Sequence, residues 1–361
     1  MSDVAAVKTP HVGPANPRSS TLAAVARAAA VDPSTVSRVL RSDPMVRVRP
    51  ETRARILAVA DELGYTPNLI ARSLVTRKSM TLGLIIPSAA NVVYEQIIRG
   101  AEHAARKAGY VLVLTESTDV GAVSSAYKEL VLGGRVDGLL IASGTSRDSL
   151  PELLREGAGN CLILNRRIRG PIPSIIEDDE RGMARGVEKL IELGHKRIAC
   201  LAGPADVDTA ARRLAGFKEA MAAAGLSVRR GYVQRAAFDE AGGYESMMRL
   251  LSLPSPPTAV AVSSLVAATG VLAACHAAGV DVPGYVSVIA FHDATVAQYL
   301  TPALSTIWMP LFELGEAASR QLVDLINGRS IPQLFRMQDP EPRVIERAST
   351  ARPRGLIGRM T

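Results

Sequence analysis

The sequence predicts a protein of two parts: an N-terminal all-α helix-turn-helix headpiece, and a larger α/β core of two doubly wound lobes of parallel sheet. Residues 21–41 fit two short amphipathic helices joined by a tight turn. From Thr81, apolar runs of strand length alternate with helical stretches over about 230 residues, which is typical of parallel sheets covered on both faces. The 361 residues also exceed the roughly 250–300 at which one core stops growing, so we expect two or more cores.

The second of the two short helices separates its side chains into an apolar and a polar face. Asp32 is a natural N-cap, and Pro33 suits the first helical position, where its missing N–H costs nothing. At about 100° per residue, one side carries Val36, Val39 and Leu40. The remainder carries Thr35, Ser37, Arg38 and Arg41. A short helix with a polar, cationic face fits the major groove of DNA, and the alternative is an ordinary surface helix of a small bundle.

Positive charge is concentrated around this helix. Residues 21–78 contain ten Lys or Arg and five Asp or Glu, a net charge of +5 out of the +7 of the whole chain. Contacts to phosphates supply most of the salt-dependent affinity of DNA-binding proteins, and such contacts require a basic module. A solvated basic face is the alternative. The helix pattern and the charge together favour DNA binding.

A third helix and a short hinge segment are expected next. The third helix begins near Glu51 and ends at Gly64, a common stop residue. Its apolar stripe consists of Ile56, Leu57, Ala60 and Leu63. Residues 69–76 then fit about two helical turns behind Asn68 as a cap. So short a helix is marginal alone in water, and we expect it to need DNA or a second subunit as its partner. The alternative is a flexible linker.

The core region shows a regular alternation of strands and helices. The expected strands are Leu82–Ile86, Val111–Leu114, Gly138–Ala142, Cys161–Leu164, Ile198–Leu201, Ala259–Val262 and Val286–Phe291. Helical stretches between them include Tyr94–Ala108, Glu180–Leu193 and Thr209–Ala224. This amount of alternating pattern predicts two lobes.

Three stretches of the N-terminal region carry a very specific pattern. Thr35–Leu40 reads TVSRVL, Arg53–Asn68 reads R-x-x-I-x-x-x-x-x-E-L-G-Y-x-P-N, and Ala71–Leu74 reads A-x-x-L. In these stretches the chain resembles the headpiece and hinge of the lactose-repressor (LacI/GalR) family. The resemblance implies DNA contacts at Thr21, Leu22, Pro33, Ser34, Thr35, Ser37, Arg38, Arg41, Asn68, Ala71 and Leu74.

Within that set, the resemblance implies different tasks for different positions. Pro33, Ser34, Thr35 and Arg38 would face bases or nearby phosphates. Leu74 would wedge into the minor groove at the operator centre, where unstacking a base step is offset by the contacts that the bend allows. The chain departs from the family at Arg41, where Asn is common, and in a slightly lengthened turn over residues 47–50. Both departures add charge near the DNA backbone.

The resemblance extends into the core through Leu193–Ala199 and Leu214–Phe217. It implies a periplasmic-binding-protein-like core with a ligand cleft between its lobes. The ligand-binding positions it implies are Tyr94, Asn165, Arg213, Phe238, Ser263, His292, Trp308 and Met309. They would lie at the carboxyl ends of strands, where open α/β sheets bind ligands. At Arg213, a guanidinium can hold a carboxylate, a phosphate or a pair of hydroxyls through two parallel hydrogen bonds.

Three departures in this set bear on the class of effector. Ser263–Ser264 stands where the family usually has Asn-Asp, and His292 stands where it usually has an Asp directed at sugar hydroxyls. The stretch Trp308–Pro310 contains the chain's one tryptophan. Losing acidic acceptors while keeping Arg213 predicts an anionic or partly apolar effector, such as a sugar acid or another organic acid. The alternative is a cleft that has lost its dependence on a ligand.

These observations give five expected segments. They are a disordered tail over residues 1–20, a helix-turn-helix domain over 21–66, a hinge over 67–80, a two-lobed effector-binding and dimerisation core over 81–347, and a disordered tail over 348–361. We expect a cytoplasmic homodimer that binds a palindromic operator in double-stranded DNA together with a small-molecule effector. We expect no cofactor, and we read the three cysteines as buried and reduced, with no CxxC pair to suggest zinc.

Other classes of function fit the sequence less well. An exported solute-binding protein would share the two lobes, but residues 1–20 show no signal pattern and a basic headpiece follows. No apolar run approaches the ~20 residues of a membrane span. An enzyme on this scaffold is conceivable, yet the chain carries no P-loop, HExxH or GxSxG motif. His195, at a helix end before a strand, is expected to be structural.

Overall fold

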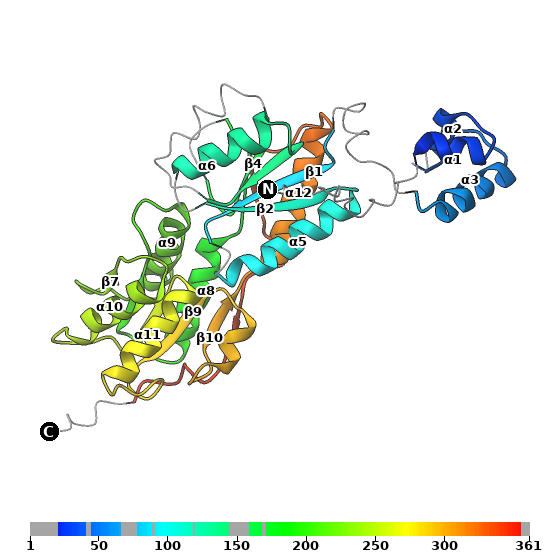
Figure 1. Cartoon of the computed structure of the whole chain (residues 1–361). Helices are drawn as coiled ribbons and strands as arrows, with labels where there is room; N and C mark the ends of the chain where they lie inside the picture. The colour runs from blue at the N-terminus through cyan, green and yellow to red at the C-terminus, as the bar shows by residue number, and fades with distance from the viewer. Residues whose placement is uncertain are drawn as a thin grey trace, which may run out of the picture. The chain divides into compact units, whose positions relative to one another are not determined.

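The computed structural model describes residues 21–40, 45–65, 78–88, 91–117, 120–143, 159–167 and 171–354 (Figure 1). The chain forms two compact units, residues 1–78 and residues 79–361. The expected tail over 1–20 and nearly all of the expected hinge lie outside the described residues. Within the described part, no helix is long and apolar enough to cross a membrane.

In the described part of the first unit, three helices surround a small apolar core. They are α1 (Leu22–Ala28), α2 (Pro33–Leu40) and α3 (Pro50–Glu62). The core consists of Val25, Ala26, Ala29, Val36, Val39, Ile56 and Ala60. After α3, Gly64 has a φ of 57°, a left-handed conformation that glycine adopts without a steric cost. The three-helix arrangement and the stop at Gly64 agree with the sequence analysis.

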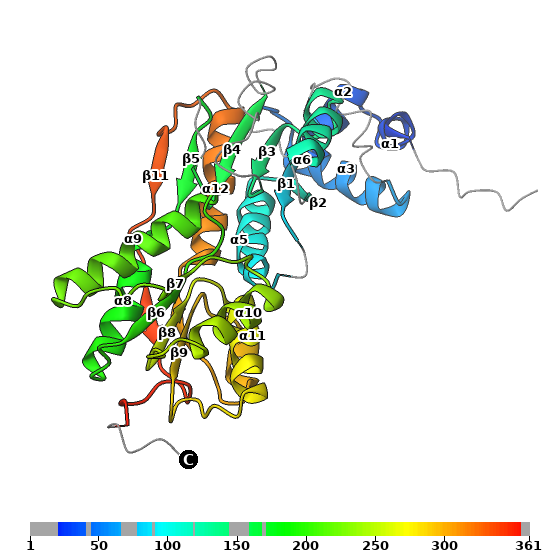
Figure 2. The same ribbon diagram turned by 90° about the vertical axis from the view of Figure 1, so that its left-hand side faces the viewer.

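The first lobe of the second unit is built on a six-stranded parallel sheet. Its strand order is β11 (Leu334–Arg336), β5 (Ser174–Ile176), β4 (Asn160–Leu164), β3 (Gly138–Ile141), β1 (Thr81–Ile86) and β2 (Val111–Glu116). Figure 2 shows β11, from near the C-terminus, beside β5 at one edge. At the other edge, β2 pairs with β1, its one strand partner among the described residues.

Helices cover both faces of this sheet. One face packs against α5 (Val93–Lys107) and α12 (Leu311–Ile326), which lie side by side in Figure 1. The other face packs against α6 (Val120–Tyr127) and the π-helical turn η1 (Lys128–Leu132). The two faces follow from the alternation of side chains along each strand. In β1, Leu84 belongs to the first core and Ile85 to the second.

The second lobe contains a six-stranded sheet with one antiparallel edge strand. Its order is β12 (Arg343–Ile345), β10 (Ser305–Trp308), β9 (Ser287–Phe291), β8 (Ala259–Val262), β6 (Ile198–Leu201) and β7 (Val233–Gln234). Only the β10–β12 pair is antiparallel among these strands. The two sheets, and the helices that alternate with their strands, confirm the expected α/β core.

This second sheet is also covered on both faces. One face packs against α8 (Asp179–Glu192) and α9 (Asp208–Ala223), and the other against α10 (Glu240–Leu251) and α11 (Leu265–Ala277). A short 3-10 helix, η2 (Thr295–Tyr299), follows β9. The apolar cluster under α5 and α12 continues into the cluster under α8 and α9. The two lobes therefore share one continuous core.

The end of the chain corrects one expectation. Residues 348–354, expected to begin a disordered tail, pack on the second lobe. Ser349 is fully buried, and its hydroxyl donates to the Val288 carbonyl (2.6 Å) and accepts from the Ser305 amide (2.8 Å). The low hydrophobicity of this segment concealed the fact that the Ser349 hydroxyl is satisfied by the β9 and β10 strands of the sheet.

His195 holds the same end of the sheet together. Its Nδ1 lies 3.0 Å from the Thr258 hydroxyl, and its Nε2 lies 3.1 Å from the Ser287 hydroxyl and 2.9 Å from the Ala351 carbonyl. Burial is the main cause that lowers its pKa. The imidazole is therefore structural, as expected.

Candidate functional site

The polar face of α2 is available at the surface of the first unit. Pro33, Ser34 and Arg38 are exposed and Thr35 is half-buried, whereas Val36 and Val39 are buried. The Asp32 carboxylate accepts a hydrogen bond from the Ser34 amide at 2.7 Å, which confirms the N-cap. Hydrogen bonds with Ser34 also lower the pKa of Asp32. The helix thus has the two faces that the sequence predicted.

The other predicted DNA contacts divide into described and undescribed positions. Thr21 caps α1, because its hydroxyl accepts from the Ala24 amide at 3.2 Å. Leu22 is half-buried and packs against the headpiece core, and Ser37 is half-buried on α2. The remaining predicted contacts, Arg41, Asn68, Ala71 and Leu74, lie outside the described residues.

In the second unit, Asn165 and His292 directly follow β4 and β9. Both are buried and have positive φ values, 62° for Asn165 and 70° for His292. Non-glycine residues seldom adopt this conformation, and such strain is concentrated at functional sites. The conformation re-aims each side chain at the carboxyl end of its strand. These two strands belong to different lobes.

Arg213, on α9, is buried and directs its guanidinium to several partners. Its Nε donates to the Asp179 carboxylate at 2.6 Å, and its Nη1 donates to the Ser263 carbonyl at 2.7 Å. Its Nη2 lies 3.4 Å from Nε2 of His292. The guanidinium carbon is 4.1 Å from the centre of the Phe291 ring. The structure thus brings together the predicted Arg213, Ser263 and His292.

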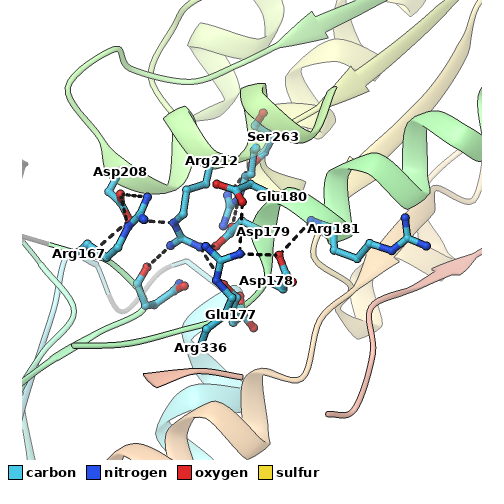
Figure 3. A network of polar contacts seen from close by, with 12 residues as sticks. Arg167, Glu177, Asp178, Asp179, Glu180, Arg181, Asp208, Arg212, Ser263 and Arg336 are labelled. Atoms are coloured by element: carbon cyan, nitrogen blue, oxygen red, sulfur yellow. Dashed lines mark hydrogen bonds and ion pairs between the residues drawn. The ribbon is translucent and has the colours of Figure 1, made fainter. Parts of the chain in front are cut away.

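Arg212, which the sequence analysis did not select, links the two lobes (Figure 3). It lies on α9 of the second lobe and is 2% exposed. Its Nη1 and Nη2 donate to the carbonyls of Glu177 (2.9 Å) and Asn165 (3.3 Å), which follow β5 and β4 of the first lobe. It also forms ion pairs with Asp179 and Asp208. One buried guanidinium therefore joins the ends of two strands to the helix of the other lobe.

A chain of alternating charges extends from this guanidinium. Asp208 pairs with Arg167 as well as with Arg212 (Figure 3). Asp179 pairs with Arg212 and Arg213. A buried charge is tolerated when it is paired and hydrogen-bonded, and these charges are. The arrangement places one acid, Asp179, beside Arg213 and a second, Asp208, beside Arg212.

Glu177 is a third acid at this place, and it differs from the other two. It is fully buried, and neither carboxylate oxygen has a hydrogen-bond partner in the described part of the chain. Burial and then the neighbouring Asp179 raise its pKa to about 8. The His292 Nε2 lies 3.7 Å from its Oε2, and burial and then Arg213 hold the pKa of that imidazole well below its usual value. At neutral pH, His292 is therefore uncharged.

Of the four remaining predicted ligand positions, Phe238 lies near Arg213, and the other three have separate surroundings. The half-buried Phe238 has its ring centre 5.8 Å from the guanidinium carbon of Arg213. Tyr94 and Met309 are buried in the core shared by the lobes. Arg343 lies over Trp308, with its guanidinium carbon 4.2 Å from the centre of the ring. The described residues hold no group of three His, Cys, Asp or Glu arranged to bind a metal ion.

Comparison with known proteins identifies the family. A family model described as bacterial regulatory proteins, lacI family, matches residues 21–68, and one described as a periplasmic binding protein-like domain matches residues 187–350. The ribose operon repressor of Escherichia coli (strain K12) is 34% identical over 316 residues, or 87% of this chain and 95% of that protein. The chain belongs to the LacI family. It is a DNA-binding transcriptional regulator with a ligand-binding core, and its named relatives include repressors.

Other LacI-family proteins match over similar lengths. Catabolite control protein A of Priestia megaterium is 31% identical over 309 residues, covering 85% of this chain and 92% of that protein. A crystal structure of the Lac repressor dimer bound to operator and the anti-inducer ONPF has a TM-score of 0.79 at 29% identity, covering 92% and 99% of the two chains. A CelR–cellobiose complex has a TM-score of 0.70 at 29% identity, covering 91% and 99%.

Proposed function

We propose that this LacI-family protein is a sequence-specific repressor whose affinity for its operator is set by a small-molecule effector bound between the two core lobes. The observation that carries the proposal is the buried polar cluster at the carboxyl ends of the strands. Asn165 and His292 supply it from opposite lobes, and Arg213 extends into it from α9. A ligand held by both lobes changes their relative position when it binds.

The coupling to DNA runs through the hinge segment, which connects the core to the headpiece. A change in how the first lobes of two subunits pair would bring the two segments 69–76 together or separate them. Operator affinity would change with this pairing, because a helix of only about two turns is marginal without a partner. Allosteric coupling of about 1–3 kcal/mol corresponds to a change of roughly 5- to 150-fold in affinity.

The effector class that we propose is a sugar acid or a related hydroxylated organic acid. Arg213 retains guanidinium N–H groups beyond those bonded to Asp179 and Ser263, and these can bind a carboxylate. The neutral His292 beside it contributes a further polar group without adding charge. The acids of the cluster favour hydroxyl groups elsewhere on the same molecule, because hydroxyls donate hydrogen bonds to carboxyl oxygens.

We propose a cytoplasmic homodimer that binds a palindromic operator. The support is the edge strand β2, whose Val111, Val113 and Leu114 are 60%, 39% and 46% exposed. An apolar, unpaired strand edge marks an interaction surface. A second copy of the chain is the partner that a two-fold symmetric operator requires.

The test of DNA recognition is a gel-shift and footprinting experiment with the full chain on DNA that flanks its own gene. We expect a two-fold symmetric footprint and a loss of about 1–3 kcal/mol, or roughly 5- to 150-fold in affinity, in Arg38→Ala, if Arg38 contacts a base edge. Arg249→Ala is the control, because Arg249 lies on α10 of the core. Equal loss on all DNA sequences would assign Arg38 to a phosphate instead.

The effector class is tested by thermal shift of the same protein with D-gluconate, D-glucuronate and D-glucose. We expect stabilisation by at least one acid and a change in operator affinity at the same concentration. Stabilisation by glucose but by neither acid would contradict the proposed class. Operator binding that responds to none of the panel would argue against effector control by sugar acids.

A further inference from the structure

The Glu177 carboxyl is a buried group with no partner in the fold. It is 0% exposed, and both of its oxygens lack hydrogen bonds in the described part of the chain. Nearly all buried polar groups of folded proteins are hydrogen-bonded, so an exception calls for a physical explanation. Leaving a buried acceptor unpaired destabilises the fold by the lost hydration of the group.

The charged neighbours of Glu177 are directed elsewhere. Arg212 donates to the Glu177 backbone carbonyl and not to its carboxyl. It also donates hydrogen bonds to Asp179, Asp208 and the Asn165 carbonyl. Arg213 donates to Asp179 and the Ser263 carbonyl. The hydrogen bonds that these two arginines donate therefore go to acceptors other than the Glu177 carboxyl.

The remaining groups that face Glu177 do not satisfy it either. His292 Nε2, 3.7 Å from Oε2, is beyond hydrogen-bond distance and closer to Arg213. Asp179 on α8 and Glu313 on α12 are acids, and both raise the pKa of Glu177 further. None of these neighbours donates a hydrogen bond to the carboxyl, so both buried oxygens are left without a donor in the described part of the chain.

A second unpartnered acceptor lies at the adjacent strand end. The Asn165 side chain is 6% exposed, and its Oδ1 has no hydrogen-bond partner in the described residues. Asn165 follows β4 and Glu177 follows β5, and these strands are neighbours in the sheet. Arg212 also joins the backbone carbonyls of the two residues. Two neighbouring strand ends are thus each followed by a buried side chain with an oxygen that has no hydrogen-bond partner among the described residues.

We propose that the side chains of Glu177 and Asn165 form a subsite that hydrogen-bonds the hydroxyl groups of the effector, with Glu177 as the residue that selects them. This inference rests on the proposed function, because it places the subsite in the effector site. The carboxylate of a sugar acid lies at Arg213, and its hydroxyl-bearing end lies at Glu177. This orientation keeps the negative charge of the effector away from the acids around Glu177. Burial keeps the Glu177 carboxyl protonated at neutral pH, so that it donates one hydrogen bond and accepts another.

The protonated Glu177 carboxyl has one oxygen that donates a hydrogen bond and one that accepts. Loss of that proton at higher pH gives the subsite a pH dependence. Above about pH 8 the carboxyl ionises beside Asp179 and Glu313, and it then repels the charge of an acidic effector. A glutamine in its place keeps one donor and one acceptor but cannot ionise. The wild-type protein should therefore lose affinity for an acid as the pH rises through about 8, whereas Glu177→Gln should not.

The experiment uses the full-length protein and its Glu177→Gln and Glu177→Leu variants, with Glu245→Gln and Glu245→Leu on the exposed face of α10 as matched controls. Dissociation constants for D-gluconate and D-glucuronate are measured by calorimetry between pH 6.5 and 9. We expect Glu177→Leu to weaken binding about tenfold or more, because it leaves effector hydroxyls unpaired. We expect Glu177→Gln to stay within about threefold of wild type at pH 7 and to flatten the pH dependence.

The unliganded proteins provide a readout that needs no effector. If Glu177 is kept for binding, its replacement by leucine leaves the melting temperature equal or higher, since a buried unpaired carboxyl is removed. A fall of more than about 5 °C in Glu177→Leu and Glu177→Gln alike would make Glu177 structural and overturn the inference. Undiminished acid affinity in Glu177→Leu would overturn it too.

The two proposals fail in distinguishable ways. If no acid binds the wild-type protein, the proposed effector class is wrong, and the melting temperatures alone decide the role of Glu177. If an acid binds the wild type and both Glu177 variants equally, the effector class stands and the subsite is wrong.

Discussion

Arg212 and Arg213 are adjacent on α9, yet they have different tasks. Arg213 extends to Ser263 and His292 in the second lobe, whereas Arg212 hydrogen-bonds the carbonyls that follow β4 and β5 in the first. Successive helical residues point about 100° apart, so neighbouring arginines face different surroundings. Only the geometry of the helix distinguishes them, since their chemistry is the same.

Removing Arg212 should destabilise the core strongly. In Arg212→Met, Asp179 loses one of its two arginines, and the carbonyls of Asn165 and Glu177 lose a donor. Breaking a buried ion pair from one side costs about 3–5 kcal/mol of the free energy of unfolding. Urea denaturation measures this change.

The control for that experiment is Arg181→Met. Arg181 forms an ion pair with Glu188 on the surface of α8, where the two side chains are 43% and 38% exposed. Exposed pairs contribute about 0–1 kcal/mol. Equal destabilisation by both variants would contradict the role of Arg212 as a buried link between the lobes.

Glu177 should give the stability of the protein a specific pH dependence. Its pKa rises from 4.5 in the unfolded chain to about 8 in the folded one, so the folded state holds an extra proton between these values. The contribution of Glu177 to the free energy of unfolding is therefore fully present below about pH 4.5 and is lost as the pH rises toward 8. Urea midpoints of the wild type should fall across this range relative to those of Glu177→Gln, and parallel curves would contradict the assignment.

At the residue scale, the sequence predicted part of the candidate site. Arg213, His292, Ser263 and Asn165 were named as ligand positions from the resemblance to the family, and the structure places them at the ends of strands and on α9. Arg212 and Glu177 were missed, because charged residues are usually solvated and nothing in their spacing reports burial. Two features of the sequence could have indicated them: the acidic run Glu177–Glu180 directly after an apolar strand, and the adjacent arginines Arg212 and Arg213.

At the scale of elements, the closest helix contact in the first lobe depends on two glycines. A Cβ atom at Gly100 of α5 would collide with the Phe312 carbonyl, and one at Gly315 of α12 would collide with the Ile97 carbonyl. Each helix thus lies against the backbone of the other. The contact fixes α12, the element by which the chain returns from the second lobe to the first.

Gly100→Ala should therefore separate the two helices. Overpacking of a well-packed contact costs about 1–3 kcal/mol, in spite of the better helix propensity of alanine. Chemical denaturation measures the loss, and Arg99→Ala is the control, because Arg99 lies on the same helix with its side chain 62% exposed. A stabilised Gly100→Ala protein would show that the helices separate without cost.

Elements with strong patterns were predicted well, and short ones were not. Long apolar runs such as Leu82–Ile86 and Ile198–Leu201 are strands as expected. The short strands β5, β7, β11 and β12 were missed, since two or three residues carry no periodicity and their pairing is decided by distant parts of the chain. Tertiary contacts, not local propensity, determine them.

At the scale of the whole molecule, the edge strand β2 should control assembly. Leu114→Lys places a charge on the exposed apolar surface of this strand. Lysine on an edge strand prevents the strand from pairing with another chain. We expect sedimentation to show a shift from dimer to monomer, and operator affinity to fall because paired headpieces are lost. Lys107→Ala on α5 is the control, as its side chain is 68% exposed. A dimer unchanged by Leu114→Lys would exclude β2 as the interface.

The order of the strands along the chain has a consequence for biosynthesis. The first sheet is completed by Leu334–Arg336 and the second by Arg343–Ile345, followed by the buried Ser349. A ribosome therefore makes the last strand of both sheets only after nearly all of the core has emerged. Until then, the edges of β5 and β10 are left uncovered on the nascent chain, in a state prone to aggregation. The headpiece core, formed within residues 25–60, is available for folding long before.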